Sequence, residues 1–250
     1  MTTFDPSKFT MPTAKPLPVV LILDVSGSMH GTKLQNLNAA VKDMLETFRG
    51  TENSEIEIHV AIIVFGAEVK LHQALASASA IKWHDLSASG GTPLGTAFTM
   101  AKAMIEDKDV MPSRAYRPTV VLVSDGMPTD DWEEPLRAFI SDGRSAKCDR
   151  MAMAIGADAD EVVLGKFNEG TKNSLFYAEN AKQLRDFFKF VTMSVTIRTK
   201  SQTPNVVPEA SAIDVKPATI EVRTEKPRSA LRNSSDETGT NQQPSEEGYW

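Results

Sequence analysis

Short apolar runs rich in valine and isoleucine alternate with amphipathic stretches from residue 17 onward. Brief runs of this kind are typical of strands buried on both faces, as in a parallel sheet whose strands are joined by helices. The alternation therefore predicts an α/β fold with a doubly wound, mostly parallel sheet and helices on both faces. Buried strands are expected at residues 18–24, 57–65, 118–124, 150–155 and 174–177.

A weaker strand is predicted at residues 68–72, directly after the second apolar run and Gly66. A connection this short permits only an antiparallel return, so the sheet should have one antiparallel edge strand. Helices are predicted where apolar residues recur three or four positions apart or where acidic residues open a helical turn. They fall at residues 34–48, 94–105, 131–141, 160–168 and 184–195.

Composition divides the chain into three parts. Residues 1–16 are polar and form an N-terminal extension, while residues 17–198 carry the α/β pattern. Residues 199–250 combine recurrent prolines with many Ser, Thr, Glu and Gln residues, which predicts a low-complexity, mostly disordered C-terminal tail. Within it, residues 212–223 alternate enough to add a strand where a sheet edge is available.

Net charge and cysteine content restrict the partners. The 27 Lys and Arg against 33 Asp and Glu give a net charge of −6, which disfavours binding to nucleic acid or anionic lipid. The first apolar run, residues 17–23, is too short for a membrane span or a signal peptide. The single cysteine, Cys148, permits no intrachain disulfide and no cysteine-built zinc site. We expect a cytoplasmic protein that binds neither nucleic acid nor membrane.

Oxygen-bearing side chains gather where two predicted strands end and where a glycine-rich loop meets a helix. In doubly wound sheets, ligands bind outside the carboxyl ends of the strands. Hydroxyls and carboxylates without histidine or cysteine are suited to a hard cation such as Mg²⁺, with Mn²⁺ or Ca²⁺ as alternatives. The candidate ligands are Asp24, Ser26, Ser28, Thr92 and Asp125.

Each segment also has a simpler structural interpretation. Asp24 and Ser26 are common capping residues in a strand-to-helix turn, and Gly90 and Gly91 are common in flexible loops. The combination of all three segments favours the metal site, because each lies where a predicted element begins or ends.

The pattern D-x-S-x-S, followed by a threonine and then an aspartate, resembles the metal-ion-dependent adhesion site of von Willebrand factor A (VWA) domains. All five positions match, and the order of strands and helices agrees from residue 17 to about residue 198. The chain is most similar to the bacterial TerY-like branch, linked to tellurite resistance, at residues 124–132, 154–160 and 187–191. The resemblance implies a Rossmann-like VWA fold with an intact adhesion site.

The resemblance also implies a role for each ligand. Ser26 and Ser28 would bind the cation directly, Thr92 directly or through water, and Asp24 and Asp125 mainly through water. An open position would then accept the Asp or Glu side chain of a partner protein. The family implies a cation-dependent protein-binding module that is not an enzyme. The TerY-like branch implies a scaffold or regulator in stress response or phage defence, beside a Ser/Thr kinase and a PP2C-type phosphatase.

An alternative function comes from another class of protein. A Mg²⁺-dependent haloacid-dehalogenase-like phosphohydrolase would use Asp24 as its nucleophile, with Ser124 and the acidic pair at residues 130–131 in support. That chemistry usually needs a second carboxylate two residues after the nucleophile, and position 26 is serine. The sequence favours the binding module.

Overall fold

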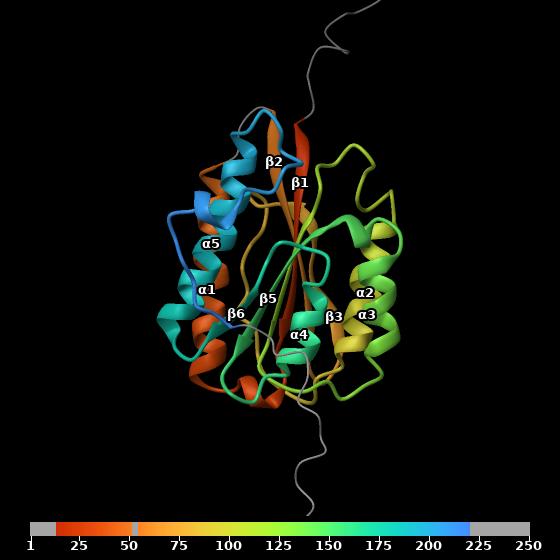
Figure 1. The fold of residues 1–250 in the computed structure, drawn as a ribbon, viewed down its shortest axis with the longest axis vertical. Coiled ribbons are helices and arrows are strands. Elements are labelled where there is room, and N and C mark those ends of the chain that lie inside the picture. The colour runs from red at the N-terminus through yellow and green to blue at the C-terminus, as the bar shows by residue number, and fades with distance from the viewer. Residues whose placement is uncertain (1–13, 52–54, 221–250) are drawn as a thin grey trace, which may run out of the picture.

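One seven-stranded sheet lies between two layers of helices in the computed structural model, which describes residues 14–51 and 55–220 (Figure 1). The strand order is β3-β2-β1-β4-β5-β6-β7. The strands are β1 (Lys15–Asp24), β2 (Ile56–Phe65), β3 (Val69–Ser77), β4 (Thr119–Ser124), β5 (Asp149–Ile155), β6 (Leu175–Ala178) and β7 (Thr219–Ile220).

The five central strands are parallel, and the two edge strands are antiparallel to their neighbours. This arrangement confirms the predicted fold class, including the β3 edge. The structure adds a second antiparallel edge, where β7 pairs Ile220 with Leu175 and Thr219 with Phe176 of β6. That strand lies within the alternating stretch at residues 212–223, which was predicted to add a strand where a sheet edge is available. The available edge is that of β6.

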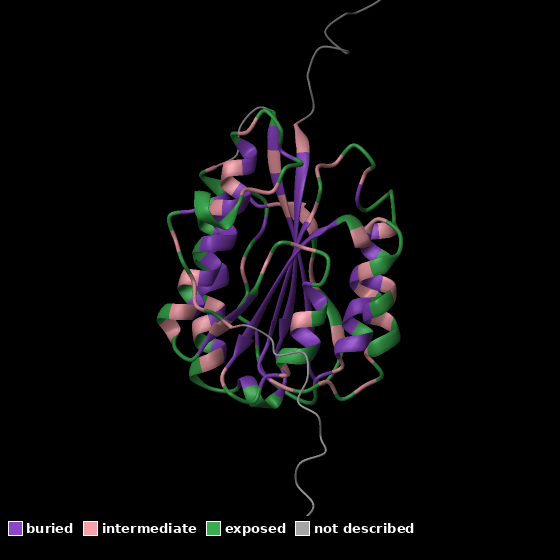
Figure 2. Cartoon of the chain, viewed as in Figure 1, coloured by how far each residue is buried: buried purple, intermediate pink, exposed green. Residues whose placement is uncertain are grey.

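Helices cover both faces of the sheet. On one face lie α1 (Thr32–Arg49) and α5 (Ala181–Thr199), and on the other lie α2 (Leu94–Glu106), α3 (Glu133–Ser141) and α4 (Glu161–Phe167) (Figure 1). The central strands are buried along their length, whereas the helix sides that face away from the sheet are largely exposed (Figure 2). The predicted helices are therefore confirmed.

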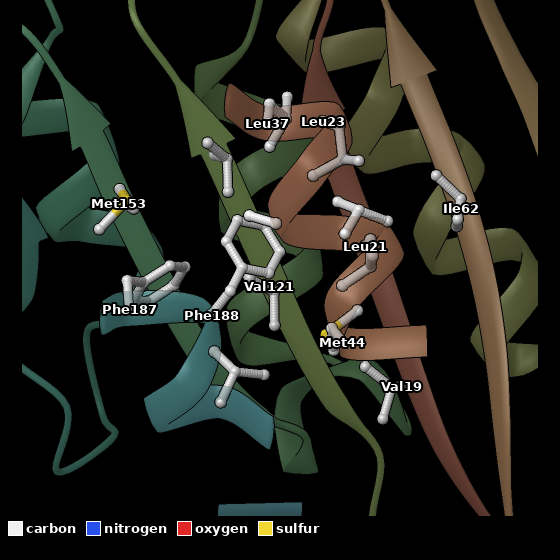
Figure 3. Packing of buried hydrophobic residues seen from close by; sticks show 14 of the residues in the cluster. Val19, Leu21, Leu23, Leu37, Met44, Ile62, Val121, Met153, Phe187 and Phe188 are labelled. Atoms are coloured by element: carbon white, nitrogen blue, oxygen red, sulfur yellow. The ribbon is translucent and has the colours of Figure 1, made fainter. Parts of the chain in front are cut away.

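Strand β1 lies inside the sheet between β2 and β4, and its side chains alternate between the two sides of the core. Leu21 and Leu23 pack on the α1 and α5 side, while Ile22 packs on the α2 side, as expected for side chains that alternate between the two faces. Figure 3 shows Leu21 and Leu23 among side chains that include Met44 of α1 and Phe188 of α5. Because β1 is buried on both faces, the residue at its carboxyl end is held rigidly within the fold.

The described part of the predicted tail, residues 199–220, contacts the domain. Arg198 at the end of α5 donates from Nε to the backbone oxygen of Pro204 at 2.7 Å, and Arg117 N–H donates to Asn205 Oδ1 at 2.8 Å. Ile213 is buried within the core on the α1 and α5 side. Strand β1 likewise begins at Lys15, inside the predicted extension. Residues 1–13 and 221–250 lie outside the described residues, so the three-part division of the chain stays a prediction.

No helix in the described ranges is both long enough and apolar enough to cross a membrane.

Candidate metal site

The sheet brings the ends of β1 and β4 together. Asp24 is the last residue of β1, and Asp125 directly follows β4, its parallel neighbour. From β1 the chain proceeds to β2 on one side, and it later returns to β4 on the other side. This is the switch point at which doubly wound sheets bind their ligands. The site lies at the lower end of the sheet in Figure 1.

Hydrogen bonds join four of the five candidate ligands into two short chains. Ser26 Oγ lies 2.9 Å from Ser28 Oγ, and the Ser28 hydroxyl donates to Asp125 Oδ1 at 2.7 Å. Asp24 Oδ1 accepts from Ser26 N–H at 2.8 Å, and its Oδ2 accepts from the Ser124 hydroxyl at 2.6 Å. Ser124 was predicted to have a role only in the phosphohydrolase alternative, whereas in the structure its hydroxyl orients Asp24.

Thr92 reaches the site from the loop before α2. Its N–H donates to Thr129 Oγ1 at 3.0 Å, and its backbone oxygen accepts from Thr129 N–H at 2.9 Å. A Cβ placed on Gly126 would lie 3.4 Å from Thr92 Oγ1 and 3.7 Å from Ser28 Oγ, so both hydroxyls approach the same glycine. The structure therefore gathers all five predicted residues at one end of the sheet.

Asp130 holds the start of α2 in place. Its Oδ1 accepts from Gly95 N–H at 2.9 Å, and its Oδ2 accepts from Thr96 N–H at 2.8 Å. A carboxylate at a helix N-terminus is favoured by the unpaired N–H groups there. Asp130 thus fixes the loop that carries Thr92. The sequence gives no sign of this contact, because Asp130 lies 35 residues from Gly95 and 34 residues from Thr96 in the chain.

The two carboxylates of the site are withdrawn from solvent. Asp24 and Asp125 are both 0% exposed, and Ser26 is 2% exposed, whereas Ser28 lies at the surface. Burial raises the pKa of Asp24, because desolvation disfavours the charged carboxylate more than the hydrogen bonds from Ser124 and Ser26 favour it. Repulsion from Asp125 adds to this rise. Two buried carboxylates that lie close together need a positive charge nearby to offset their repulsion.

Lys33 supplies one such positive charge. It is the second residue of α1, and its ammonium forms an ion pair with Asp125 Oδ2. Lys33 is not among the residues predicted for the site. The signal in the sequence is its position at a helix N-terminus, where a positive charge is unfavourable unless something nearby offsets it.

The chemistry of the site fits a hard cation. Within residues 14–51 and 55–220, no three His, Cys, Asp or Glu side chains are grouped in a way that could hold a metal ion. The oxygen-rich candidates are instead two carboxylates and three hydroxyls, a donor set that suits Mg²⁺, Mn²⁺ or Ca²⁺. His30 is exposed and follows the 3-10 turn Gly27–Met29.

Comparison with known proteins gives the family. Residues 19–190, more than half of the chain, match the von Willebrand factor type A domain. The chain belongs to this family. It is 24% identical over 189 residues to human inter-alpha-trypsin inhibitor heavy chain H6 and 25% identical over 194 residues to heavy chain H4 of Sus scrofa. The alignments cover 70% and 72% of this chain but only 14% and 20% of those relatives.

Solved structures show the same fold. A von Willebrand factor type A protein from Catenulispora acidiphila superposes with a TM-score of 0.56 at 22% identity, covering 72% of this chain and 43% of that one. The pilus adhesin SpaC from Lactobacillus rhamnosus GG gives a TM-score of 0.57 at 16% identity, covering 74% of this chain and 30% of that one. At this level of identity, the similarity concerns the fold of the VWA domain.

Proposed function

We propose that this VWA domain binds one divalent cation through Asp24, Ser26, Ser28, Thr92 and Asp125, and binds an acidic side chain of a partner protein through that cation. VWA domains in general are metal-dependent protein-interaction modules. The observation that supports the site here is the hydrogen-bonded chain from Ser26 to Ser28 to Asp125 at the switch point of the sheet. Mg²⁺ is the proposed ion, with Mn²⁺ and Ca²⁺ as alternatives.

The proposed division of roles follows the resemblance to the VWA adhesion site. Ser26 and Ser28 would contact the ion directly, and Thr92 would contact it directly or through water. Asp24 and Asp125, which lie fully buried, would act mainly through water. A cation held chiefly by neutral oxygens retains much of its charge and attracts an anionic ligand. The ion would supply this attraction and an open coordination position.

We propose that the protein is not an enzyme. VWA domains are generally interaction modules without catalysis. The phosphohydrolase alternative needs Asp24 as an accessible nucleophile, yet this carboxylate is fully buried and accepts the Ser124 hydroxyl. It also needs the acidic pair at residues 130–131, and Asp130 caps α2. Both observations favour the binding function.

The cellular role is a further proposal. We place the protein in the cytoplasm as a scaffold or regulator of a TerY-like stress-response or defence system, with a Ser/Thr kinase or a PP2C-type phosphatase as its partner. This assignment rests on the sequence resemblance at residues 124–132, 154–160 and 187–191.

Thr92→Ala tests the proposed function, with Thr99→Ala in α2 as a matched control. Titration calorimetry with MgCl₂ should show one site in the full chain and in Thr99→Ala, and binding at least about tenfold weaker in Thr92→Ala, because a ligand hydroxyl is lost. Circular dichroism should show that both variants are folded. Partner proteins bound to a column that carries the immobilised full chain should elute when EDTA is added.

Equal Mg²⁺ affinities in Thr92→Ala and Thr99→Ala would contradict the ligand assignment. Hydrolysis of p-nitrophenyl phosphate that requires Mg²⁺ and disappears in Asp24→Asn would instead support the phosphohydrolase alternative.

A further inference from the structure

Lys33 places a positive charge beside the candidate metal site. Its ammonium pairs with Oδ2 of Asp125, while Oδ1 of the same carboxylate accepts the Ser28 hydroxyl at 2.7 Å. Asp125 is fully buried, whereas the Lys33 side chain remains 35% exposed. The lysine therefore connects the buried carboxylate with the surface on which a ligand of the cation would arrive.

The stability of α1 does not account for a lysine at this position. Lys33 lies in the first turn of the helix, which contains no acidic side chain. The unpaired N–H groups of a first turn carry partial positive charge, so a lysine there is unfavourable. The contact with Asp125 offsets this repulsion and gives the position its explanation.

The backbone after β5 lies beside the Lys33 side chain. Gly156 follows β5 with a φ of 76°, and a Cβ built on it would lie 3.7 Å from Lys33 Nζ. The ammonium thus lies between the residues that follow β4 and β5. A side chain at position 156 would be strained by the positive φ, and its Cβ would be in ordinary van der Waals contact with the lysine.

The net charge of the site would change sign when a divalent cation binds. Asp24, Asp125 and Lys33 together carry −1, and a divalent cation would bring the total to +1. Without the lysine, the total after binding would be zero. A nearby ammonium repels an incoming cation and attracts an incoming carboxylate.

We propose that Lys33 weakens binding of the cation alone and strengthens binding of a carboxylate to the cation-loaded site, so that the protein holds its metal firmly only together with an acidic ligand. This inference rests on the proposed function. In the metal-free protein, Lys33 partly neutralises the buried carboxylate pair. With the cation bound, it adds to the attraction for the ligand.

The test compares Lys33→Met with Lys42→Met, which makes the same charge change at an exposed position of α1. Lys33→Arg keeps the charge. Calorimetric titration of the full chain with MgCl₂ measures binding of the cation alone. Titration of the Mg²⁺-saturated chain with sodium acetate, followed by backbone amide NMR shifts against a matched NaCl titration, measures binding of a simple carboxylate.

Lys33→Met should bind Mg²⁺ about tenfold more tightly, equivalent to about 1.4 kcal/mol, and should bind acetate several-fold more weakly. Lys33→Arg should stay within about threefold of the unaltered chain in both titrations, because the charge is retained. Lys42→Met should leave both affinities unchanged. The two opposite changes at one position distinguish an electrostatic role from a structural one.

Weaker Mg²⁺ binding by Lys33→Met would overturn the inference, since it would mean that the lysine serves to position Asp125. Identical behaviour of Lys33→Met and Lys42→Met would overturn it as well. Absence of Mg²⁺ binding by the unaltered chain is a separate result. It would overturn the proposed function and, with it, this inference.

Discussion

Replacing Asp24 with asparagine separates what the fold requires from what a bound cation requires. Asp24 ends β1, where its two oxygens accept hydrogen bonds from Ser26 N–H and the Ser124 hydroxyl. Asparagine has the same shape and retains one acceptor oxygen. The Ser124 hydroxyl has lone pairs with which to accept from the new amide group. We therefore expect Asp24→Asn to fold normally while losing one buried negative charge.

The stability effect without metal follows from the raised pKa of Asp24, which burial drives above its ordinary value of 3.8. A carboxyl group with a higher pKa in the folded than in the unfolded chain binds its proton more tightly when folded. The free energy of unfolding therefore falls as pH rises from 3.8 through the raised pKa, and it stays low at pH 7. Metal-free Asp24→Asn should therefore be more stable than the unaltered chain at pH 7, because the buried carboxylate charge is gone.

The effect of Mg²⁺ should run in the opposite direction. At one hundred times its Kd, the ion should raise the free energy of unfolding of the unaltered chain by about 2.7 kcal/mol. For a chain of this size, the corresponding rise in Tm is about 5 to 11 °C. If loss of the carboxylate weakens binding tenfold, the same Mg²⁺ concentration should stabilise Asp24→Asn by only about 1.4 kcal/mol.

Urea unfolding followed by circular dichroism, in EDTA and in MgCl₂ at pH 5 and pH 7, measures the free energies of unfolding, and thermal unfolding in the same buffers measures Tm. Asp43→Asn, at an exposed position of α1, is the matched control for the charge change. A metal-free Asp24→Asn protein that is less stable than Asp43→Asn at pH 7 would refute the electrostatic reasoning. Equal Mg²⁺ increments in the two variants would refute the role of Asp24 in the site.

Two further predictions concern the opposite end of the sheet. Arg198→Met should lower the free energy of unfolding by about 3 to 5 kcal/mol in urea melts, because its buried guanidinium donates to Pro204 O and to Thr119 Oγ1 and offsets the buried charge of Asp149. A loss below about 1 kcal/mol would contradict this. Burial raises the pKa of Cys148 to about 12, so its thiol should react with Ellman's reagent at pH 8 only after unfolding in urea. Rapid labelling of the folded chain would show that this thiol is accessible.

Most of the sheet could be predicted from the sequence because its strands are buried on both faces. The apolar run at residues 18–24, for example, corresponds to the strand Lys15–Asp24, with the boundary shifted by three residues at the start. Strand β7 is harder to predict, because two residues with one exposed side chain carry little apolar signal. Its position depends on the free edge of β6, which exists only in the folded sheet.

The candidate ligands could be predicted because each follows or precedes a recognisable element. Asp24 and Asp125 come at strand ends, and parallel strands place their carboxyl ends on the same edge of the sheet. Lys33 and Asp130 could not be assigned in this way. Their roles depend on contacts with residues 92 and 35 positions away, respectively, and an exposed-looking charge in a first helical turn has many ordinary explanations.

The site combines rigid and adaptable parts, and this division bears on its proposed use. The carboxylates of Asp24 and Asp125 are fixed by buried strands and by hydrogen bonds from Ser124 and Ser28. Ser28 is exposed in the 3-10 turn Gly27–Met29, and Met127, two residues after Asp125, is 67% exposed. An exposed, flexible side chain of this kind adapts to differently shaped partner surfaces. Under the proposed function, partner choice would vary through these exposed residues, while the buried carboxylates beside the proposed cation stay fixed by the core.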